Sequence, residues 1–178
     1  MILEIELSEG VTASMQESTL ILKGAGGEFS RDFLNPKINV SVADGKVKLL
    51  ASDATKREKM MLGTFRAHIR NMMKGVTQSH TYRLKICSGH FPMNVSVSGR
   101  DFAVKNFLGE KIPRKFTFVK NVDVKVNGQE IVVKSVSKEV AGQTAANIEQ
   151  LTRVKGRDRR IFQDGIYIIE KDGKLIEQ

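Results

Sequence analysis

The stretch INVSVADGKVKLL, residues 38–50, contributes most to the prediction of the fold. Apolar and polar residues alternate on both sides of Asp44-Gly45, a dipeptide that favours a tight two-residue turn. The pattern predicts a β-hairpin with one buried face. The segment VDVKVNGQEIVV, residues 122–133, alternates in the same way around an Asn-Gly turn and predicts a second hairpin.

A segment with helical periodicity follows each predicted hairpin. Residues 55–76 place apolar side chains at helical spacing, and Thr55 with Glu58 has the spacing of a capping box. Residues 140–151 repeat the periodicity with smaller apolar side chains. We therefore expect one main helix in each half of the chain.

The two halves also match in register. At an offset of 79 residues, matching residues form the pairs Lys59/Lys138, Gly63/Gly142, Ile69/Ile148 and Met72/Leu151. A weaker similarity pairs LILKG (20–24) with VSVSG (95–99), and Phe33-Leu34 with Phe107-Leu108. Chance similarity of short hairpin and helix patterns is the alternative to a duplication.

The pattern predicts an α+β fold made of two tandem similar domains. We expect an N-terminal repeat at residues 1–80 and a C-terminal repeat at residues 81–178, each with an antiparallel sheet packed against its main helix. The seam should lie near residues 77–84, and residues 166–169 should form a last strand.

Composition and charge indicate a folded protein with a polyanionic partner. The chain has 178 residues, of which 40% are hydrophobic, and a formal net charge of +9. Such a charge attracts nucleic acid, although solvated basic faces are the alternative. The sequence has one cysteine, Cys87, no apolar run long enough to cross a bilayer and an acidic N-terminus. We expect a cytoplasmic protein that has no membrane partner.

The densest cluster of cations is the stretch RVKGRDRR, residues 153–160, between the second helix and the last strand. Guanidinium groups bind phosphate oxygens in a bidentate fork, so we expect this connection to contact RNA phosphates. A solvated loop is the alternative. Because its cations repel one another and no apolar anchor precedes Ile161, we expect a partner to order it. The candidate residues are Arg153, Lys155, Arg157, Arg159 and Arg160.

Both predicted helices offer further candidates. Gly142 lies in a helix interior, where glycine is unfavourable, among small or hydrogen-bonding residues that could approach RNA closely. Packing of this helix against the sheet explains Gly142 equally well. The first helix carries a basic stripe that could be a secondary RNA contact or a solvated face. The stripe comprises Lys59, Arg66, Arg70 and Lys74.

Sites for catalysis, metals and cofactors are poorly supported. His80, Cys87 and His90 are too few for a structural zinc site, and Cys87 at the end of a predicted strand should be buried rather than nucleophilic. The glycines of KGAGG, residues 23–27, lack the ending of a phosphate-binding loop and indicate a turn. Few aromatic residues accompany the cations, which favours folded RNA over single strands.

The stretch QLTRVKGRDRRIFQDGIYIIEK, residues 150–171, resembles the large-subunit ribosomal protein six family of the archaeal and eukaryotic type. VAGQTAANIEQ and FPMNVSVSG also match this family, whereas the bacterial type has a Tyr-Lys-Gly-Lys-Gly segment in place of the arginine-rich loop. The defining positions are occupied by Arg160, Phe162, Asp164, Gly165 and Tyr167.

The resemblance implies a structural component of the large ribosomal subunit, which is not an enzyme and needs no cofactor or small-molecule substrate. It implies binding to large-subunit (23S-type) rRNA near the sarcin–ricin loop and the factor-binding region, mainly through the C-terminal domain, beside neighbouring large-subunit proteins. The implied contacts are the basic loop with Lys138, Gly142, Gln143 and Asn147. The alternatives are a small enzyme with a reactive Cys87 or histidine and a free RNA-binding regulator.

Overall fold

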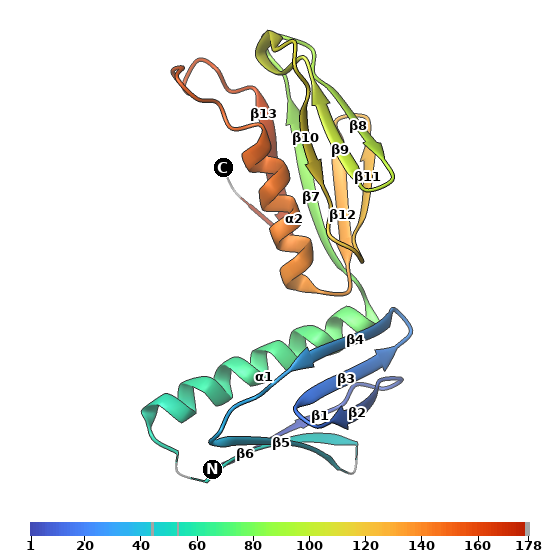
Figure 1. The fold of residues 1–178 in the computed structure, drawn as a ribbon, viewed down its shortest axis with the longest axis vertical. Helices are drawn as coiled ribbons and strands as arrows, with labels where there is room; N and C mark the ends of the chain where they lie inside the picture. Colours follow the sequence, from blue (N-terminus) through green and yellow to red (C-terminus); the bar gives the residue numbers. More distant parts are fainter. Residues whose placement is uncertain (44, 53, 177–178) are drawn as a thin grey trace. The chain divides into compact units, whose positions relative to one another are not determined.

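The computed structural model describes residues 1–43, 45–52 and 54–176. It divides the chain into two compact units, residues 1–79 and 80–178, each combining antiparallel sheets with one long helix (Figure 1). The α+β fold class with two similar domains is therefore confirmed.

The N-terminal unit contains six strands and one helix among its described residues. In chain order they are β1 (Ile2–Glu6), β2 (Thr12–Gln16), β3 (Thr19–Gly24), β4 (Gly27–Asp32), β5 (Ile38–Ala43), β6 (Lys46–Ala51) and α1 (Lys56–Thr77). The strands form two sheets, in the orders β1-β6-β5 and β2-β3-β4.

The C-terminal unit repeats this arrangement and extends it. Its elements are β7 (His80–Cys87), β8 (Asn94–Ser98), β9 (Asp101–Lys105), a 3₁₀ turn (Phe107–Gly109), β10 (Arg114–Thr117), β11 (Asp123–Asn127), β12 (Glu130–Ser135), α2 (Lys138–Leu151), β13 (Gly165–Lys171) and β14 (Lys174–Leu175). One sheet has the order β10-β9-β8, and the other has the order β11-β12-β7-β13-β14. Each unit thus has two sheets, where the sequence pattern predicts one.

Both predicted hairpins are present. Strands β5 and β6 pair antiparallel, with Val42 opposite Val47, and β11 and β12 pair with Val126 opposite Ile131. The predicted turn residue Asp44 lies outside the described residues. The alternation of apolar and polar residues predicted these strands correctly, because each strand buries one face.

The weaker sequence similarity proves to be misaligned. LILKG lies in β3, the middle strand of its sheet, whereas VSVSG begins in β8, an edge strand, so the two are not equivalent. The equivalent of Phe33 is Phe118, because each follows the third strand of its sheet and donates its amide to a turn, at 2.9 Å to the Ser18 carbonyl and at 2.8 Å to the Arg100 carbonyl. An inserted 3₁₀ turn between β9 and β10 changes the offset, which the sequence pairing overlooked.

The two helices follow equivalent hairpins but pack mainly on different sheets of their units. Helix α1 packs on β3 and β4, and its start is capped by Glu58, whose carboxylate accepts the Thr55 amide at 3.1 Å. Helix α2 packs on β7, β12 and β13 and also on β10. At the offset of 79 residues, buried positions of the helices coincide: Leu62/Ala141, Phe65/Thr144 and Ile69/Ile148.

The glycines of KGAGG form the predicted turn between β3 and β4, and the structure explains why they are glycines. The Gly26 amide donates to the Val76 carbonyl of α1 at 2.6 Å. A Cβ at Gly24 or Gly26 would lie 2.7 or 2.9 Å from that carbonyl oxygen. Close approach of the helix end therefore requires residues without a side chain.

Strands β13 and β14 have no counterpart in the described part of the N-terminal unit. Strand β13 pairs antiparallel with β7, so the chain must return from the end of α2 to the open side of β7 (Figure 1). Residues 153–164, which we call the basic loop, make this return. The cationic segment is therefore a consequence of the added strand.

Candidate nucleic-acid interface

The basic loop starts at the C-terminal end of α2, where backbone carbonyls have no partner within the helix. Arg114 of β10 supplies one, because its guanidinium donates to the Leu151 carbonyl at 2.7 Å and to the Arg153 carbonyl at 3.5 Å. Glu110 holds Arg114 by two hydrogen bonds of 2.5 and 2.8 Å, and that hydrogen bonding lowers the pKa of the Glu110 carboxyl. The start of the loop is thus fixed from a neighbouring sheet.

The strand after the loop is tied to the same helix. The amides of Ile166 and Ile168 donate to side chains of α2 and its cap rather than to a strand: the Thr152 hydroxyl accepts the first at 2.9 Å and the Glu149 carboxylate the second at 3.1 Å. Thr152 is 2% exposed, so its hydroxyl replaces a solvent partner that this edge of β13 lacks.

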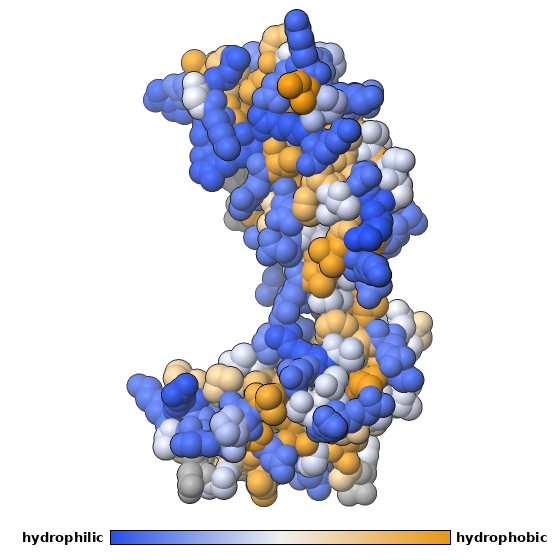
Figure 2. Space-filling model, in the orientation of Figure 1, coloured by the Kyte–Doolittle hydropathy of each residue, from blue (hydrophilic) through white to orange (hydrophobic). Residues whose placement is uncertain are grey.

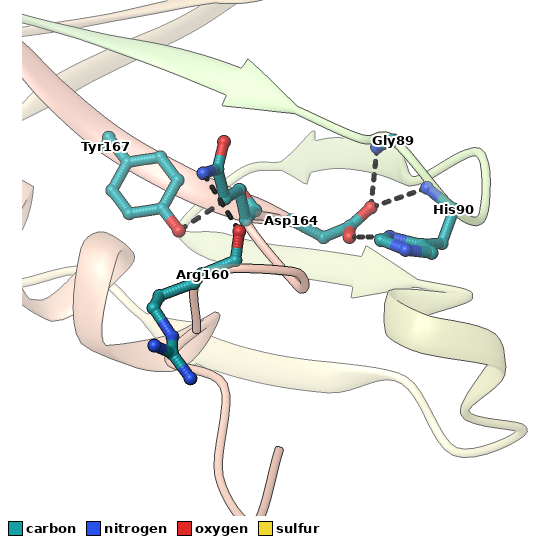
Figure 3. A network of polar contacts seen from close by, with 6 residues as sticks. Gly89, His90, Arg160, Asp164 and Tyr167 are labelled. Carbon is teal, nitrogen blue, oxygen red and sulfur yellow. Dashed lines mark hydrogen bonds and ion pairs between the residues drawn. The ribbon is translucent and has the colours of Figure 1, made fainter. Parts of the chain in front are cut away.

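Asp164 anchors the end of the loop. The register of β13 against β7 sets Gly165 opposite Cys87, so Asp164 reaches the turn that follows β7. Its carboxylate accepts the backbone amides of Gly89 at 2.6 Å and His90 at 3.0 Å, and it lies 2.5 Å from His90 Nδ1 (Figure 3). Asp164 is 2% exposed. It therefore joins two segments that are distant in sequence.

The charge state of this carboxylate follows from its partners. Burial favours the neutral acid, but the hydrogen bonds from His90 and Gly89 favour the anion and outweigh it, so the pKa of Asp164 is lowered. An aspartate anion only accepts hydrogen bonds, so His90 Nδ1 is the donor in this contact. The imidazole orientation is thereby set by Asp164.

A row of stacked side chains runs from His90 to the loop. The His90 and Phe162 rings stack with centroids 4.6 Å apart and planes at 24°. The Arg157 guanidinium carbon lies 4.8 Å from the centroid of the Phe162 ring, a cation–π distance. One cation of the basic loop is therefore held against a ring that belongs to the same loop.

Asp158 organises the middle of the loop. Its carbonyl accepts the amides of Ile161 at 3.2 Å and Phe162 at 2.9 Å, and its carboxylate binds the Arg160 guanidinium at 2.8 Å. Hydrogen bonding from Arg160 lowers the pKa of the Asp158 carboxyl. Arg160 is thus partly neutralised by the acid two residues before it.

We expected no apolar anchor before Ile161 and took Ile161 itself as the first one, and the structure contradicts both points. Val154 precedes Ile161 and is only 8% exposed, so the loop does have an early anchor. Ile161 is 63% exposed and anchors nothing. Both ends of the loop are bonded to the domain and the Asp158 turn is bonded within the loop, so the described contacts support much of this loop without a partner.

Tyr167 of β13 contacts the last residues of the basic loop. Its hydroxyl donates to the Gln163 carbonyl at 3.2 Å, and the side-chain Nε2 of Gln163 donates to the Arg160 carbonyl at 3.2 Å (Figure 3). The Tyr167 ring lies over Gly165, where a Cβ would meet it at 3.2 Å. Burial raises the pKa of Tyr167. The Asp-Gly-x-Tyr pattern thus has a structural explanation.

The predicted loop cations gather on one exposed region. Arg153, Lys155, Arg157 and Arg159 are all exposed, and none of them forms a salt bridge with any residue the structure describes. Hydrophilic residues cover much of the region where this loop lies (Figure 2). A cavity of about 310 Å³ lies beside it, with Glu149, Arg153, Arg159 and Tyr167 among its lining residues.

The predicted contacts on α2 are more dispersed. Gln143 is exposed, and its side-chain Nε2 donates to Asn147 Oδ1 at 2.9 Å, so these two residues share one face of the helix. Lys138 is the first residue of α2, about 20 Å from the loop along the helix axis, and lies 4.0 Å from Asp172. A Cβ at Gly142 would lie 3.2 Å from the Tyr82 hydroxyl oxygen, so packing against the sheet accounts for this glycine.

The secondary stripe lies on α1 of the other unit. Its four members are exposed and spaced so that they share one helix face; they are Lys59, Arg66, Arg70 and Lys74. The spacing and exposure suit either an RNA contact or a solvated face.

The residues weighed for a metal or an enzyme site have structural partners. His80 Nδ1 lies 3.0 Å from Asp172, His90 lies against Asp164, and Cys87 is half-buried rather than fully buried as expected. Residues 1–43, 45–52 and 54–176 contain no group of three or more His, Cys, Asp or Glu that could hold a metal ion. Over the same described residues, no helix is both long enough and apolar enough to cross a bilayer.

Two kinds of comparison identify similar proteins. The family model described as "Ribosomal protein L6" matches residues 7–79 and 91–165, one match in each unit. "Large ribosomal subunit protein uL6" of Methanococcus vannielii is 45% identical over 173 residues, which cover 97% of this chain and 95% of the relative. The protein of the same description from Methanosarcina mazei is 45% identical over 167 residues, 94% of this chain and 95% of the relative.

Proposed function

Because the chain belongs to the ribosomal protein L6 family, we propose that it is a structural component of the large ribosomal subunit in the cytoplasm. It binds large-subunit rRNA mainly through its C-terminal unit and has no catalytic activity of its own. Its similarity to two proteins named for the large subunit, over nearly their whole length, supports this assignment.

The observation that carries the RNA contact is the arrangement of the basic loop. Four exposed cations have no salt bridge within the described residues, while the backbone that carries them is bonded at both ends. A cluster of unpaired cations is unfavourable for the free protein and favourable beside phosphates, where counterions are released on binding. The four are Arg153, Lys155, Arg157 and Arg159.

The face of α2 next to the loop extends the proposed contact. Gln143 and Asn147 offer donors and acceptors suited to ribose hydroxyls and base edges. Gly142 contributes by keeping α2 close to β7, and Lys138 adds charge at the far end of the helix. The stripe on α1 is proposed as a secondary contact.

The family resemblance supports a proposed position within the subunit. We place the protein near the sarcin–ricin loop and the factor-binding region, beside neighbouring large-subunit proteins. The rival roles, an enzyme with Cys87 or a histidine as reactive group and a free RNA-binding regulator, would not require stoichiometric assembly into the subunit.

Sedimentation distinguishes these roles. The chain, carrying an affinity tag, is expressed in an archaeon that contains such a relative, and ribosomal subunits are separated on gradients after a high-salt wash. We expect one tagged copy per large subunit when the untagged relative is deleted, and none in small subunits. Recovery mainly in the free protein pool would refute the structural role.

A further inference from the structure

We propose that Asp164 is a positioning residue for RNA binding, which acts through His90 and Phe162 to hold the Arg157 guanidinium in one orientation for an RNA phosphate. The proposal rests on the function proposed above and deepens it by assigning the best-ordered phosphate contact to one arginine of the basic loop. It also assigns a role to a carboxylate that cannot itself face RNA.

The first step is the isolation of Asp164 from solvent. With 2% of its surface exposed and three donors on its carboxylate, it has no free surface for a ligand. A buried carboxylate satisfied in this way fixes the positions of its donors, because leaving any of them unpaired is costly. Its effect on RNA must pass through the groups it holds.

The second step is the imidazole. The His90 side chain is 37% exposed, so one side meets solvent while Nδ1 faces Asp164 at 2.5 Å. The backbone amide of His90 binds the same carboxylate at 3.0 Å. Two bonds to one group leave the ring little freedom to rotate, and its face is turned to Phe162, 4.6 Å away between centroids.

The third step connects Phe162 to Arg157. The Phe162 amide donates to the Asp158 carbonyl at 2.9 Å, and its ring contacts both the His90 imidazole and the Arg157 guanidinium, whose carbon lies 4.8 Å from the ring centroid. A guanidinium stacked on an aromatic face keeps its N–H edge free for a bidentate phosphate contact. Restricting a long side chain before binding reduces the entropy lost on binding.

The other loop cations that form no salt bridge with a described residue lack such a support. Among the described residues, Arg153, Lys155 and Arg159 have no aromatic ring contact and no salt bridge. They therefore lack the stacking contact that restricts the Arg157 side chain. This difference provides the comparison that a test needs.

A double-mutant cycle on binding to a large-subunit rRNA fragment tests the connection. We expect Arg157→Ala to weaken binding about tenfold and Asp164→Asn several-fold, but Asp164→Asn to change affinity by less than about twofold in the Arg157→Ala background. In the matched Arg153→Ala background, Asp164→Asn should keep its full effect. Phe162→Leu, which retains apolar bulk without a ring, should behave as Asp164→Asn does.

A measurement on the free protein separates this proposal from the proposed function. In nuclear magnetic resonance spectra, the Phe162 ring should shift the resonances of the Arg157 side chain, and Asp164→Asn and Phe162→Leu should reduce that shift. Asp123→Asn, which removes an exposed carboxylate on β11 of the same unit, should leave it largely unchanged, and circular dichroism confirms that each variant is folded.

The outcomes are distinct. Equal effects of Asp164→Asn in the Arg157→Ala and Arg153→Ala backgrounds, or an unchanged Arg157 ring shift in folded Asp164→Asn, would overturn the positioning role. Failure of the unaltered protein to bind any large-subunit rRNA fragment would instead overturn the proposed function, and the ring shift would still decide whether Asp164 orders Arg157.

Discussion

The Asp164 carboxylate and the His90 imidazole meet at 2.5 Å although 74 residues separate them in the chain. This contact joins the end of the basic loop to the turn after β7, and two backbone amides bind the same carboxylate. The loop that carries the cations is therefore part of the folded domain, held by an acid that neutralises none of the exposed arginines.

The first prediction concerns the stability of the protein at low pH. Because the pKa of Asp164 is lowered in the folded protein, its contribution to stability is complete above the unfolded pKa of about 3.9 and is lost as the pH falls through the lower folded value. Asp164→Asn should lower the free energy of unfolding by about 1–3 kcal/mol at neutral pH. Urea titrations from pH 7 to pH 3 should show the difference shrinking. A difference independent of pH would contradict the assignment.

The second prediction concerns the link between α2 and β13. Thr152→Val keeps the shape of the buried side chain but leaves the Ile166 amide without its acceptor, at a cost of about 1–3 kcal/mol in the free energy of unfolding of the C-terminal unit. Thr64→Val serves as a control, since Thr64 is exposed on α1. Amide exchange measured during chemical denaturation gives the free energy of unfolding of each unit separately. Equal losses at the two sites would show that the Thr152 contact is unimportant.

The third prediction uses two glycines that match in sequence but not in surroundings. A Cβ at Gly63 of α1 meets nothing within 4 Å, whereas one at Gly142 of α2 meets the Tyr82 hydroxyl at 3.2 Å. Gly63→Ala should stabilise by about 0.5–1 kcal/mol through helix propensity. Gly142→Ala should gain less or lose, because the Tyr82 ring must move. Thermal unfolding measures both, and an equal gain would mean that α2 does not need this close approach.

Elements with local signals were predictable from the sequence. The hairpins around residues 38–50 and 122–133 could be read because alternation and turn dipeptides are local features, and the helices because Leu62 and Ile69 follow one face. The duplication could be recognised where no insertion intervened. Pairing of LILKG with VSVSG failed because the order of strands within a sheet is not encoded in a five-residue match.

The internal support of the loop could not be predicted in the same way. Ile161 has an apolar side chain but points to solvent, and Val154 is buried, because the return path to β7 decides which residues face the domain. The partners of Asp164 depend on the register of β13 against β7, a pairing of distant segments. For Asp164, the only signal in the sequence was its place between Phe162 and Gly165 in the family motif.

The fourth prediction concerns salt. If the four loop cations that form no salt bridge with a described residue neutralise about four phosphates, the logarithm of the rRNA association constant should fall with the logarithm of salt concentration with a slope of about −3 to −4. Filter binding or fluorescence anisotropy across a range of salt concentrations provides the slope. A flat response would contradict electrostatic binding by the loop.

The most direct test of the central claim compares two triple substitutions of equal charge. Arg153, Arg157 and Arg159 changed to Ala should weaken binding to large-subunit rRNA at least about 100-fold, at about 1.5–3 kcal/mol per charged hydrogen bond lost, with the domain still folded. Lys59, Arg66 and Arg70 of α1 changed to Ala should weaken it far less. Equal losses from the two triples would contradict the account, because total charge rather than the basic loop would then determine binding.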